Sequence, residues 1–481
     1  MSTATTLAGS PTDAGAEFRL LIDGHLVTGA DAFDVINPAN ERLLARCPRA
    51  DLAQLNRAVA AAKAAFPSWS RRALAERRAL LLQVAEKLAS RSEELGRLLT
   101  QEQGKPLLQA RREIERSSGM IRAFAAMDLP ETVLKNTADV RIVRQRAALG
   151  VVAAITPWNL PIILLMSKFA PALLAGNTIV FKPAPTTPLT TLRFGEICAE
   201  VLPAGVANVI TDLNDLGDAL TSHPDVAKVA FTGSTVTGRK VMASAAGTVK
   251  RLTLELGGND AALVMDDANI ATVAPKIFAG AMANSGQVCL AIKRVYAPDS
   301  LYEALCEILV RLADAAVVGD GLEVGTEFGP LQNQAQLGRV QGFVDEARAR
   351  GRIIAGGVRL DRPGYFMRPT IVRDIPDDAR LVRDEQFGPV LPVLRYSQLD
   401  DAITRINDSE YGLSATVWGT DLQRAYEAAS RIYSGTVWVN KHLDLRPDVP
   451  FAGAKQSGLG TELGIEGLEE FTQSRVINMA R

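Results

Sequence analysis

Two residues able to do covalent or acid–base chemistry stand alone in apolar stretches of this sequence. Cys289 lies in NSGQVCLA (284–291), after a Ser-Gly-Gln turn, and Glu255 lies in LTLELGGND (252–260), inside a predicted strand. A cysteine in such a loop can serve as a nucleophile, although a lone buried cysteine is more often a small hydrophobic residue. A glutamate in an apolar strand is costly unless it is paired or functional.

Polar groups also follow the ends of three further predicted strands. Lys182 ends the strand NTIVFK, and Asn159 lies between two prolines in ITPWNLP. Gly233 and Ser234 lie in FTGSTVTGRKV, just before a predicted helix. Ligands of open α/β sheets bind beyond the carboxyl ends of strands, and a helix N-terminus binds anions. Each stretch also has a plainer structural interpretation. Lys182 could be a surface lysine, Asn159 could form an Asx turn, and Gly233 with Ser234 could form a capped turn. Taken alone, each stretch leaves the functional and the structural interpretation open.

The composition excludes several classes of function. The net charge is −1, from 53 basic and 54 acidic side chains, which gives no electrostatic reason to expect nucleic acid or an anionic membrane. The 4 cysteines and 3 histidines show no metal-ligand spacing, so we expect no metal site. Scattered cysteines and the lack of a secretory pattern predict a cytoplasmic protein. The longest apolar segment, 161–176, contains Lys168 and Pro171 and does not predict a membrane span.

The elements that would position these residues follow from the pattern of apolar residues. Residues 1–16 predict a disordered N-terminus, and 52–125 predicts helices. From residue 150, short β-branched runs alternate with helical segments, which predicts parallel βαβ units and a doubly wound sheet. A second alternating region runs from about 259 past 440. VRIVRQRA near 140 and SRVINMA at the end predict exposed strands outside the main sheets.

The motifs together are far more specific than any one of them. PWN, FKP, FTGST, LELGG, GQVC, EQFGP and PFAGAKQSG occur in this order. From about residue 20 to its end the chain closely resembles the aldehyde dehydrogenase superfamily, in its bacterial, non-phosphorylating, NAD(P)-dependent branch. The resemblance implies an α/β fold with a Rossmann-like cofactor domain, an α/β catalytic domain and a β-arm that joins subunits of a homodimer or homotetramer. The implied segments are 17–126 and 149–256 for the cofactor domain, 257–467 for the catalytic domain, and 127–148 and 468–481 for the arm.

By this resemblance, Cys289 is the nucleophile that attacks the aldehyde and forms a thiohemiacetal and then a thioester. The amide of Asn159 and the backbone N–H of Cys289 hold the oxyanion. Glu255 activates the water that releases a carboxylic acid, because burial raises the pKa of a carboxyl group. Lys168 is placed with these catalytic residues.

The resemblance also implies the residues that contact NAD(P). They are Thr156, Pro157, Trp158, Lys182, Gly233, Ser234, Leu256, Glu385 and Phe387. Many NAD-preferring members have a glutamate for the adenosine ribose where this chain has Pro185, so NAD is the first choice and NADP stays open. Ala452 is a smaller departure, because it replaces a glycine of the family motif.

The implied substrate tunnel argues for an uncharged, apolar aldehyde of medium-chain aliphatic, terpenoid or aromatic type. Where succinic semialdehyde enzymes place arginines, this chain has Ser167 and Ala283. Arg446 lies close in the sequence and could supply the missing charge, which keeps a semialdehyde as the alternative. A CoA-acylating enzyme or a catalytically silent binding protein fits less well, since Glu255 and Cys289 are both present. The tunnel positions are Leu160, Ile163, Leu164, Ser167, Ala283, Leu290, Leu443, Leu445 and Phe451.

Overall fold

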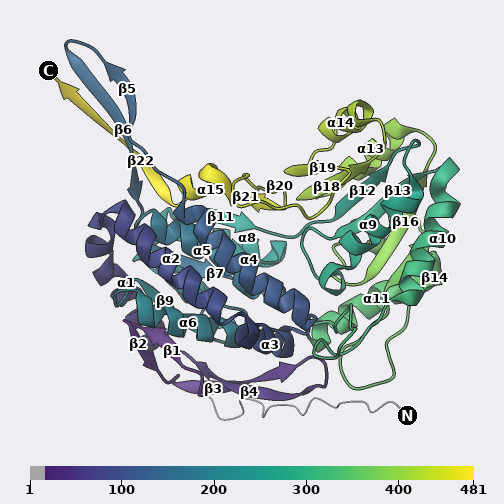
Figure 1. Cartoon of the computed structure of the whole chain (residues 1–481), viewed down its shortest axis with the longest axis horizontal. Coiled ribbons are helices and arrows are strands. Elements are labelled where there is room, and N and C mark those ends of the chain that lie inside the picture. The colour runs from purple at the N-terminus through teal and green to yellow at the C-terminus, as the bar shows by residue number, and fades with distance from the viewer. Residues whose placement is uncertain (1–16) are drawn as a thin grey trace.

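The computed structural model describes residues 17–481, and the predicted disordered segment 1–16 lies outside the described residues. Two α/β units lie side by side, and a narrow β-arm projects from the first of them (Figure 1). No helix within residues 17–481 is long and apolar enough to span a bilayer.

The first sheet has eight strands in the order β2-β1-β9-β8-β7-β10-β11-β21. Its five central strands are parallel, and the outer strands β1, β2 and β21 pair antiparallel. The predicted parallel α/β sheet is therefore confirmed. The strands are β1 Leu20–Ile22, β2 His25–Val27, β7 Val151–Ile155, β8 Thr178–Lys182, β9 Ala207–Val209, β10 Val226–Thr232, β11 Arg251–Glu255 and β21 Gly458–Leu459.

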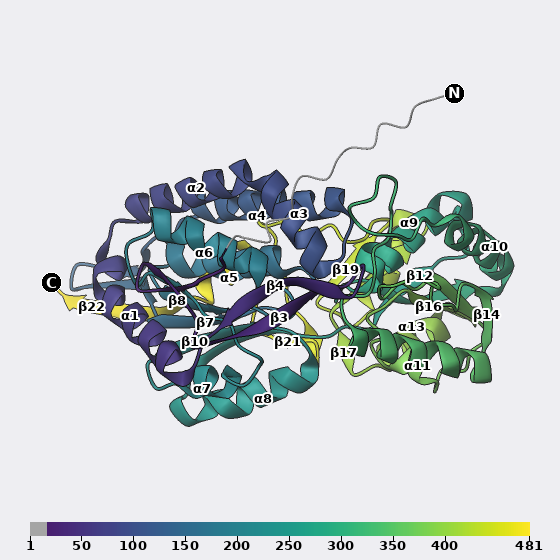
Figure 2. The ribbon, with the colours of Figure 1, turned by 90° about the horizontal axis from the view of Figure 1, so that it is seen from below.

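Helices cover both faces of this sheet, with α2 to α6 stacked on one side and α7 and α8 on the other (Figure 2). Because both faces are covered, the central strands read as continuous apolar runs rather than alternating ones. Every residue of β7 and of β8 is buried. The helices are α1 Leu52–Arg71, α2 Leu74–Ser90, α3 Ser92–Gln103, α4 Leu107–Ala125, α5 Pro161–Leu174, α6 Leu189–Val201, α7 Gly217–Ser222 and α8 Thr235–Ala245.

The second sheet has seven strands in the order β14-β15-β16-β13-β12-β18-β19, parallel except for the edge strand β14. Its strands are β12 Asp260–Val264, β13 Ile292–Pro298, β14 Arg352–Ala355, β15 Thr370–Arg373, β16 Val390–Tyr396, β18 Ser414–Trp418 and β19 Thr436–Val439. Its helices are α9 Ile270–Met282, α10 Asp299–Ala315, α11 Gln334–Arg350, α12 Arg380–Arg383, α13 Leu399–Asn407 and α14 Leu422–Ser430.

The arm is a separate three-stranded sheet of β5 Thr132–Asn136, β6 Val140–Ala148 and β22 Thr472–Ala480. β22 pairs antiparallel with β6 along its whole length, which joins the two predicted arm segments. Apolar side chains are exposed on it, namely Val133, Leu134, Val476, Ile477 and Met479. Pairing of this arm with another subunit and the predicted domain boundaries stay predictions. The remaining elements are β3 Asp31–Asn37, β4 Arg42–Arg49, β17 Tyr411–Gly412, β20 Ala454–Lys455, α15 Gly464–Glu469 and two short 3₁₀ helices, η1 Ala246–Thr248 and η2 Ala283–Gly286.

Candidate active site

Cys289 lies where two cavities meet between the sheets. One cavity measures about 610 Å³ and the other about 240 Å³, and both are lined by Cys289, Glu255 and Leu164. β11 ends at Glu255, and its pairing with β21 (Glu255 opposite Gly458) fixes that end. Cys289 lies in the short loop before β13. The predicted nucleophile and base therefore share one site, reached from two sides.

The backbone ahead of Cys289 is turned sharply. Asn284 and Ser285 both have positive φ angles, 49° and 56°, in the left-handed region that non-glycine residues rarely adopt. Ser285 Oγ donates to the carbonyl of Gly329 at 2.8 Å, and Asn284 Nδ2 donates to the carbonyl of Asn159 at 3.1 Å. These contacts offset the cost of the turn, which carries the chain from α9 to the thiol.

Asn159 lies beside the loop that carries the thiol, and its predicted role is to hold a negative oxygen there. Its side-chain Nδ2 donates to the carbonyl of Gln287 at 3.0 Å, and the residue is buried. An amide nitrogen has two hydrogens, so one remains for a ligand. The backbone N–H of Cys289 donates to no acceptor within residues 17–481. Asn159 and Cys289 line the same cavity, so these two donors are available there, as the predicted oxyanion site requires.

Glu255 is a buried carboxyl group with no hydrogen-bond partner for either oxygen within the described part of the chain. Burial raises its pKa well above the ordinary value, and the negative charge of Glu462 raises it further. The nearby positive charge of Lys168 acts in the opposite direction. Such a group binds a proton readily, which suits a general base.

Lys168 is held away from both cavities by a network that the sequence did not reveal. Its Nζ donates to Glu462 Oε1 at 2.8 Å and to Thr232 Oγ1 at 2.6 Å. Ser167 Oγ donates to Glu462 Oε2 at 3.1 Å. The predicted catalytic residue Lys168 therefore acts on Glu255 through its positive charge, which lowers the pKa of that carboxyl group. Glu462 follows β21 and belongs to no motif, so no local signal points to it.

The smaller cavity contains groups that could bind the phosphates of a dinucleotide. It lies over the N-terminus of α8, where Ser234 is the capping residue, and free N–H groups at a helix N-terminus bind phosphate. Glu385 accepts from the backbone N–H of Gly258 at 3.1 Å. A Cβ at Gly257 would lie 2.6 Å from Glu385 Oε2, so a larger residue there would displace this carboxylate.

Most predicted cofactor residues line this cavity. They are Pro157, Trp158, Gly233, Ser234, Leu256, Glu385 and Phe387. Trp158 and Phe387 meet edge to face, with ring centroids 5.3 Å apart. Lys182 and Thr156 do not line it. Lys182 Nζ lies 2.7 Å from Asp212 Oδ1, and the N–H of Thr156 donates to the carbonyl of Lys182.

All nine predicted tunnel positions line the larger cavity. The structure adds a group of charged residues that the sequence did not indicate. Lys105 and Glu113 form a buried ion pair, whereas Arg112 and Arg116 are exposed and have no carboxylate within 4.0 Å in residues 17–481. The predicted positions thus line one cavity with mostly apolar side chains, and its exposed part carries Arg112 and Arg116. Their role as a substrate tunnel stays a prediction. Arg446 lies outside this lining and pairs with Asp448 at 3.2 Å.

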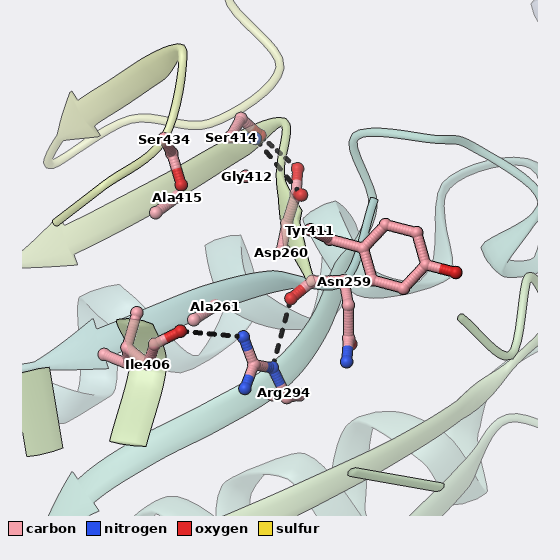
Figure 3. A pocket seen from close by; sticks show the side chains of 10 residues that line it. All are labelled: Asn259, Asp260, Ala261, Arg294, Ile406, Tyr411, Gly412, Ser414, Ala415 and Ser434. Atoms are coloured by element: carbon pink, nitrogen blue, oxygen red, sulfur yellow. Dashed lines mark hydrogen bonds between the residues drawn. The ribbon is translucent and has the colours of Figure 1, made fainter. Parts of the chain in front are cut away.

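A third, far smaller cavity lies behind the site, next to Asp260 and Arg294 (Figure 3). Its volume is about 10 Å³, roughly what a single water needs. Arg294 Nε donates to the carbonyl of Asn259 at 3.1 Å, and Ser414 donates to Asp260. These contacts tie β12, β13 and β18 together, and the space is too small for a substrate.

Comparison with known proteins identifies the family. The model of the aldehyde dehydrogenase family matches residues 26–477. The mitochondrial aldehyde dehydrogenase of Leishmania tarentolae is 36% identical over 100% of this chain and 98% of its own. The NADP(+) succinate-semialdehyde dehydrogenase GabD of Escherichia coli is 36% identical over 95% of this chain and 96% of its own.

A solved structure supports the same assignment. Betaine aldehyde dehydrogenase of Staphylococcus aureus, crystallised with NAD⁺, superposes with a TM-score of 0.93 at 34% identity. The match covers 96% of this chain and 94% of that one, which confirms the predicted fold. The chain belongs to the aldehyde dehydrogenase family.

Proposed function

We propose that this protein oxidises an aldehyde to a carboxylic acid with NAD(P)⁺ through a covalent intermediate on Cys289. The observation that carries the proposal is that both cavities open onto Cys289 and Glu255. An aldehyde in the larger cavity and a nicotinamide in the smaller one would therefore meet at the thiol. Absorbance at 340 nm with hexanal and NAD⁺, with and without CoA, tests it. Turnover that requires CoA would contradict the proposal.

The steps follow from the groups around the thiol. The Cys289 thiolate attacks the carbonyl carbon and forms a C–S bond, while Asn159 Nδ2 and the Cys289 N–H hold the oxyanion. The bound cofactor supplies the hydride acceptor. Loss of hydride from the thiohemiacetal carbon leaves a thioester on Cys289. Glu255 then takes a proton from water, the resulting hydroxide attacks the thioester, and the C–S bond breaks to release the acid.

The cofactor would lie along the smaller cavity with its phosphates at the N-terminus of α8. Ser234, Leu256, Glu385 and Phe387 would hold the pyrophosphate and nicotinamide end. Lys182 lies further along the sheet, where Asp212 and Asn214 bind its ammonium group. By the family resemblance Lys182 would contact the adenosine ribose, which would lie beyond this cavity. NAD remains the first choice.

Pro185→Glu should depress activity with NADP and leave activity with NAD largely unchanged. Pro185 is partly exposed just after β8, and a carboxylate there would repel a 2′-phosphate. The measurement is kcat/KM for NAD and NADP in the parent protein and the variant. An unchanged ratio would remove position 185 from cofactor choice.

Uncharged apolar aldehydes of medium-chain aliphatic, terpenoid or aromatic type are the substrates that this tunnel fits best. Leu290, Phe451 and Leu164 line the cavity that contains the thiol. Each buried methylene would gain about 0.8 kcal/mol, whereas a carboxylate left unpaired against these side chains would cost several kcal/mol. The short chain of succinic semialdehyde would place its carboxylate against this wall.

The basic open end of the tunnel favours a second candidate, an aldehyde long enough to place a distal carboxylate near Arg112 and Arg116. Both guanidinium groups lack a carboxylate partner within residues 17–481. Arg116 also lowers the pKa of Asp444, but that carboxylate already pairs with Lys441 at 2.6 Å.

In a panel of hexanal, benzaldehyde, a terpenoid aldehyde and succinic semialdehyde, we expect kcat/KM to be lowest for succinic semialdehyde. A kcat/KM for succinic semialdehyde that is tenfold or more above those of the uncharged aldehydes would contradict the apolar assignment.

The double variant Arg112→Ala/Arg116→Ala tests the second candidate, the aldehyde with a distal carboxylate. It should lower kcat/KM for a long ω-carboxy aldehyde and leave hexanal unaffected.

A further inference from the structure

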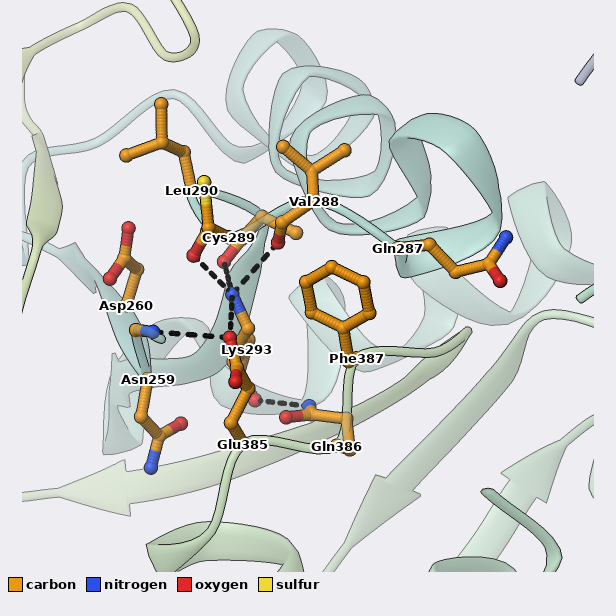
Figure 4. A network of polar contacts seen from close by, with 12 residues as sticks. Asn259, Asp260, Gln287, Val288, Cys289, Leu290, Lys293, Glu385, Gln386 and Phe387 are labelled. Carbon is orange, nitrogen blue, oxygen red and sulfur yellow. Dashed lines mark hydrogen bonds and ion pairs between the residues drawn. The ribbon is translucent and has the colours of Figure 1, made fainter. Parts of the chain in front are cut away.

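Lys293 is buried directly beneath the loop that carries the nucleophile. Its Nζ donates to three backbone carbonyls, those of Val288 at 3.0 Å, Cys289 at 2.5 Å and Ala291 at 3.2 Å. Figure 4 shows these contacts converging on one ammonium group. A lysine is rarely so fully buried, and burying its charge is costly unless polar groups surround it. Here the surrounding groups belong to the catalytic loop itself.

The two carbonyls that Lys293 does not reach are bound from other elements. Asn159 Nδ2 donates to the carbonyl of Gln287, and His442 Nε2 lies 2.8 Å from the carbonyl of Leu290. Burial lowers the pKa of His442 to about 4, so the ring is neutral and Nε2 carries the hydrogen toward this oxygen. All five carbonyls from 287 to 291 therefore point at side-chain donors. The N–H of Cys289 is left free to face the substrate.

Charges around the thiol come from four other elements. Burial raises the pKa of the Cys289 thiol well above its usual range, and nearby carboxylates raise it further. They are Glu255 on β11, Asp260 on β12 and Glu385 in the loop before β16. Lys293 is the cation that opposes them. Its Nζ also lies 3.9 Å from Glu385 Oε1.

We propose that Lys293 is a positioning residue for Cys289, which holds the loop in its attacking shape and stabilises the thiolate with its charge. The proposal rests on Cys289 being the nucleophile of the proposed function. Hydrogen bonds to carbonyls on both sides of the thiol fix the loop, and a buried positive charge favours the ionised sulfur. The residue touches neither substrate nor cofactor in this role.

The test is the pH dependence of alkylation of Cys289 by iodoacetamide, measured on the full chain without substrate. Lys293→Gln retains a hydrogen-bond donor and removes the charge, whereas Lys293→Met removes both. We expect each variant to move the alkylation midpoint up by about one pH unit, so that the rate at pH 7 falls about tenfold. Lys293→Met should lose more of kcat than Lys293→Gln, because its loop is no longer held.

Two controls make the result specific. Lys276→Met removes an exposed lysine from α9 and should leave the midpoint unchanged, and Cys289→Ser gives the background from the other cysteines. An unchanged midpoint in Lys293→Gln would overturn the proposal and make Lys293 a core-filling residue; this variant decides the question even where Lys293→Met does not fold. Alkylation needs no turnover, so it gives its answer whether or not aldehydes are oxidised.

Discussion

Cys289→Ala will abolish aldehyde oxidation and leave NAD⁺ binding intact. The covalent route requires the thiolate, and no other side chain in the shared part of the two cavities can form a thioester. The proposed cofactor contacts belong to the N-terminus of α8, Lys182, Leu256, Glu385 and Phe387, which the substitution leaves in place. Turnover should fall by at least about 10³-fold, measured as NADH formation with hexanal. NAD⁺ binding is followed by the shift of the thermal melting curve.

Cys306→Ala is the matched control for this loss. Cys306 is buried on α10 in the core of the second sheet and lines neither of the two cavities, so an aldehyde in them would not reach its thiol. This variant should keep near-normal turnover. A dead Cys306→Ala beside an active Cys289→Ala would show that the nucleophile has been assigned to the wrong cysteine.

The sequence was sufficient to predict the residues that stand at strand ends. Glu255, Lys182 and Gly233 each follow or end a buried parallel strand, and the carboxyl ends of parallel strands meet at one edge of a sheet. The position of these residues at strand ends in the sequence therefore predicts that they lie near one another in the fold. The tunnel positions came from the family resemblance, by counting residues from Asn159, Cys289 and Asn440, and the structure places all of them around one cavity.

The residues that were not predicted depend on contacts between distant segments. Arg112 and Arg116 look like the solvated face of a helix, and only the packing of α4 against α5 brings them to the tunnel. Glu462 reaches Lys168 across 294 positions of the chain. In the sequence Lys293 looks like an ordinary strand residue. Only the fold shows that its side chain turns back onto the loop that precedes the strand. No periodicity or spacing encodes such contacts.

The pKa of Glu255 also depends on contacts between distant segments, so the sequence alone could not give it in full. An apolar strand predicts burial, but the pKa also depends on Glu462 and Lys168, which the fold alone brings near. Burial and Glu462 outweigh Lys168, and the pKa of Glu255 is raised. A base acts only when it is deprotonated, so the rate of turnover falls as the pH drops through the pKa of Glu255. Because this pKa is raised, we expect that acid limb of the pH profile to lie at higher pH than for an ordinary glutamate.

Glu255→Gln should therefore separate the two halves of the reaction. Acylation needs the thiolate and the oxyanion donors, which the amide leaves in place, whereas thioester hydrolysis needs the carboxylate. The first turnover should appear as a burst of NADH, while the steady rate falls by about 10²-fold or more and loses the acid limb of the parent protein. Stopped-flow absorbance at 340 nm across pH 6 to 9 measures both phases. Glu466→Gln, an exposed position on α15, should change neither. A burst that disappears together with steady turnover would mean that Glu255 activates the thiol of Cys289 rather than the hydrolytic water.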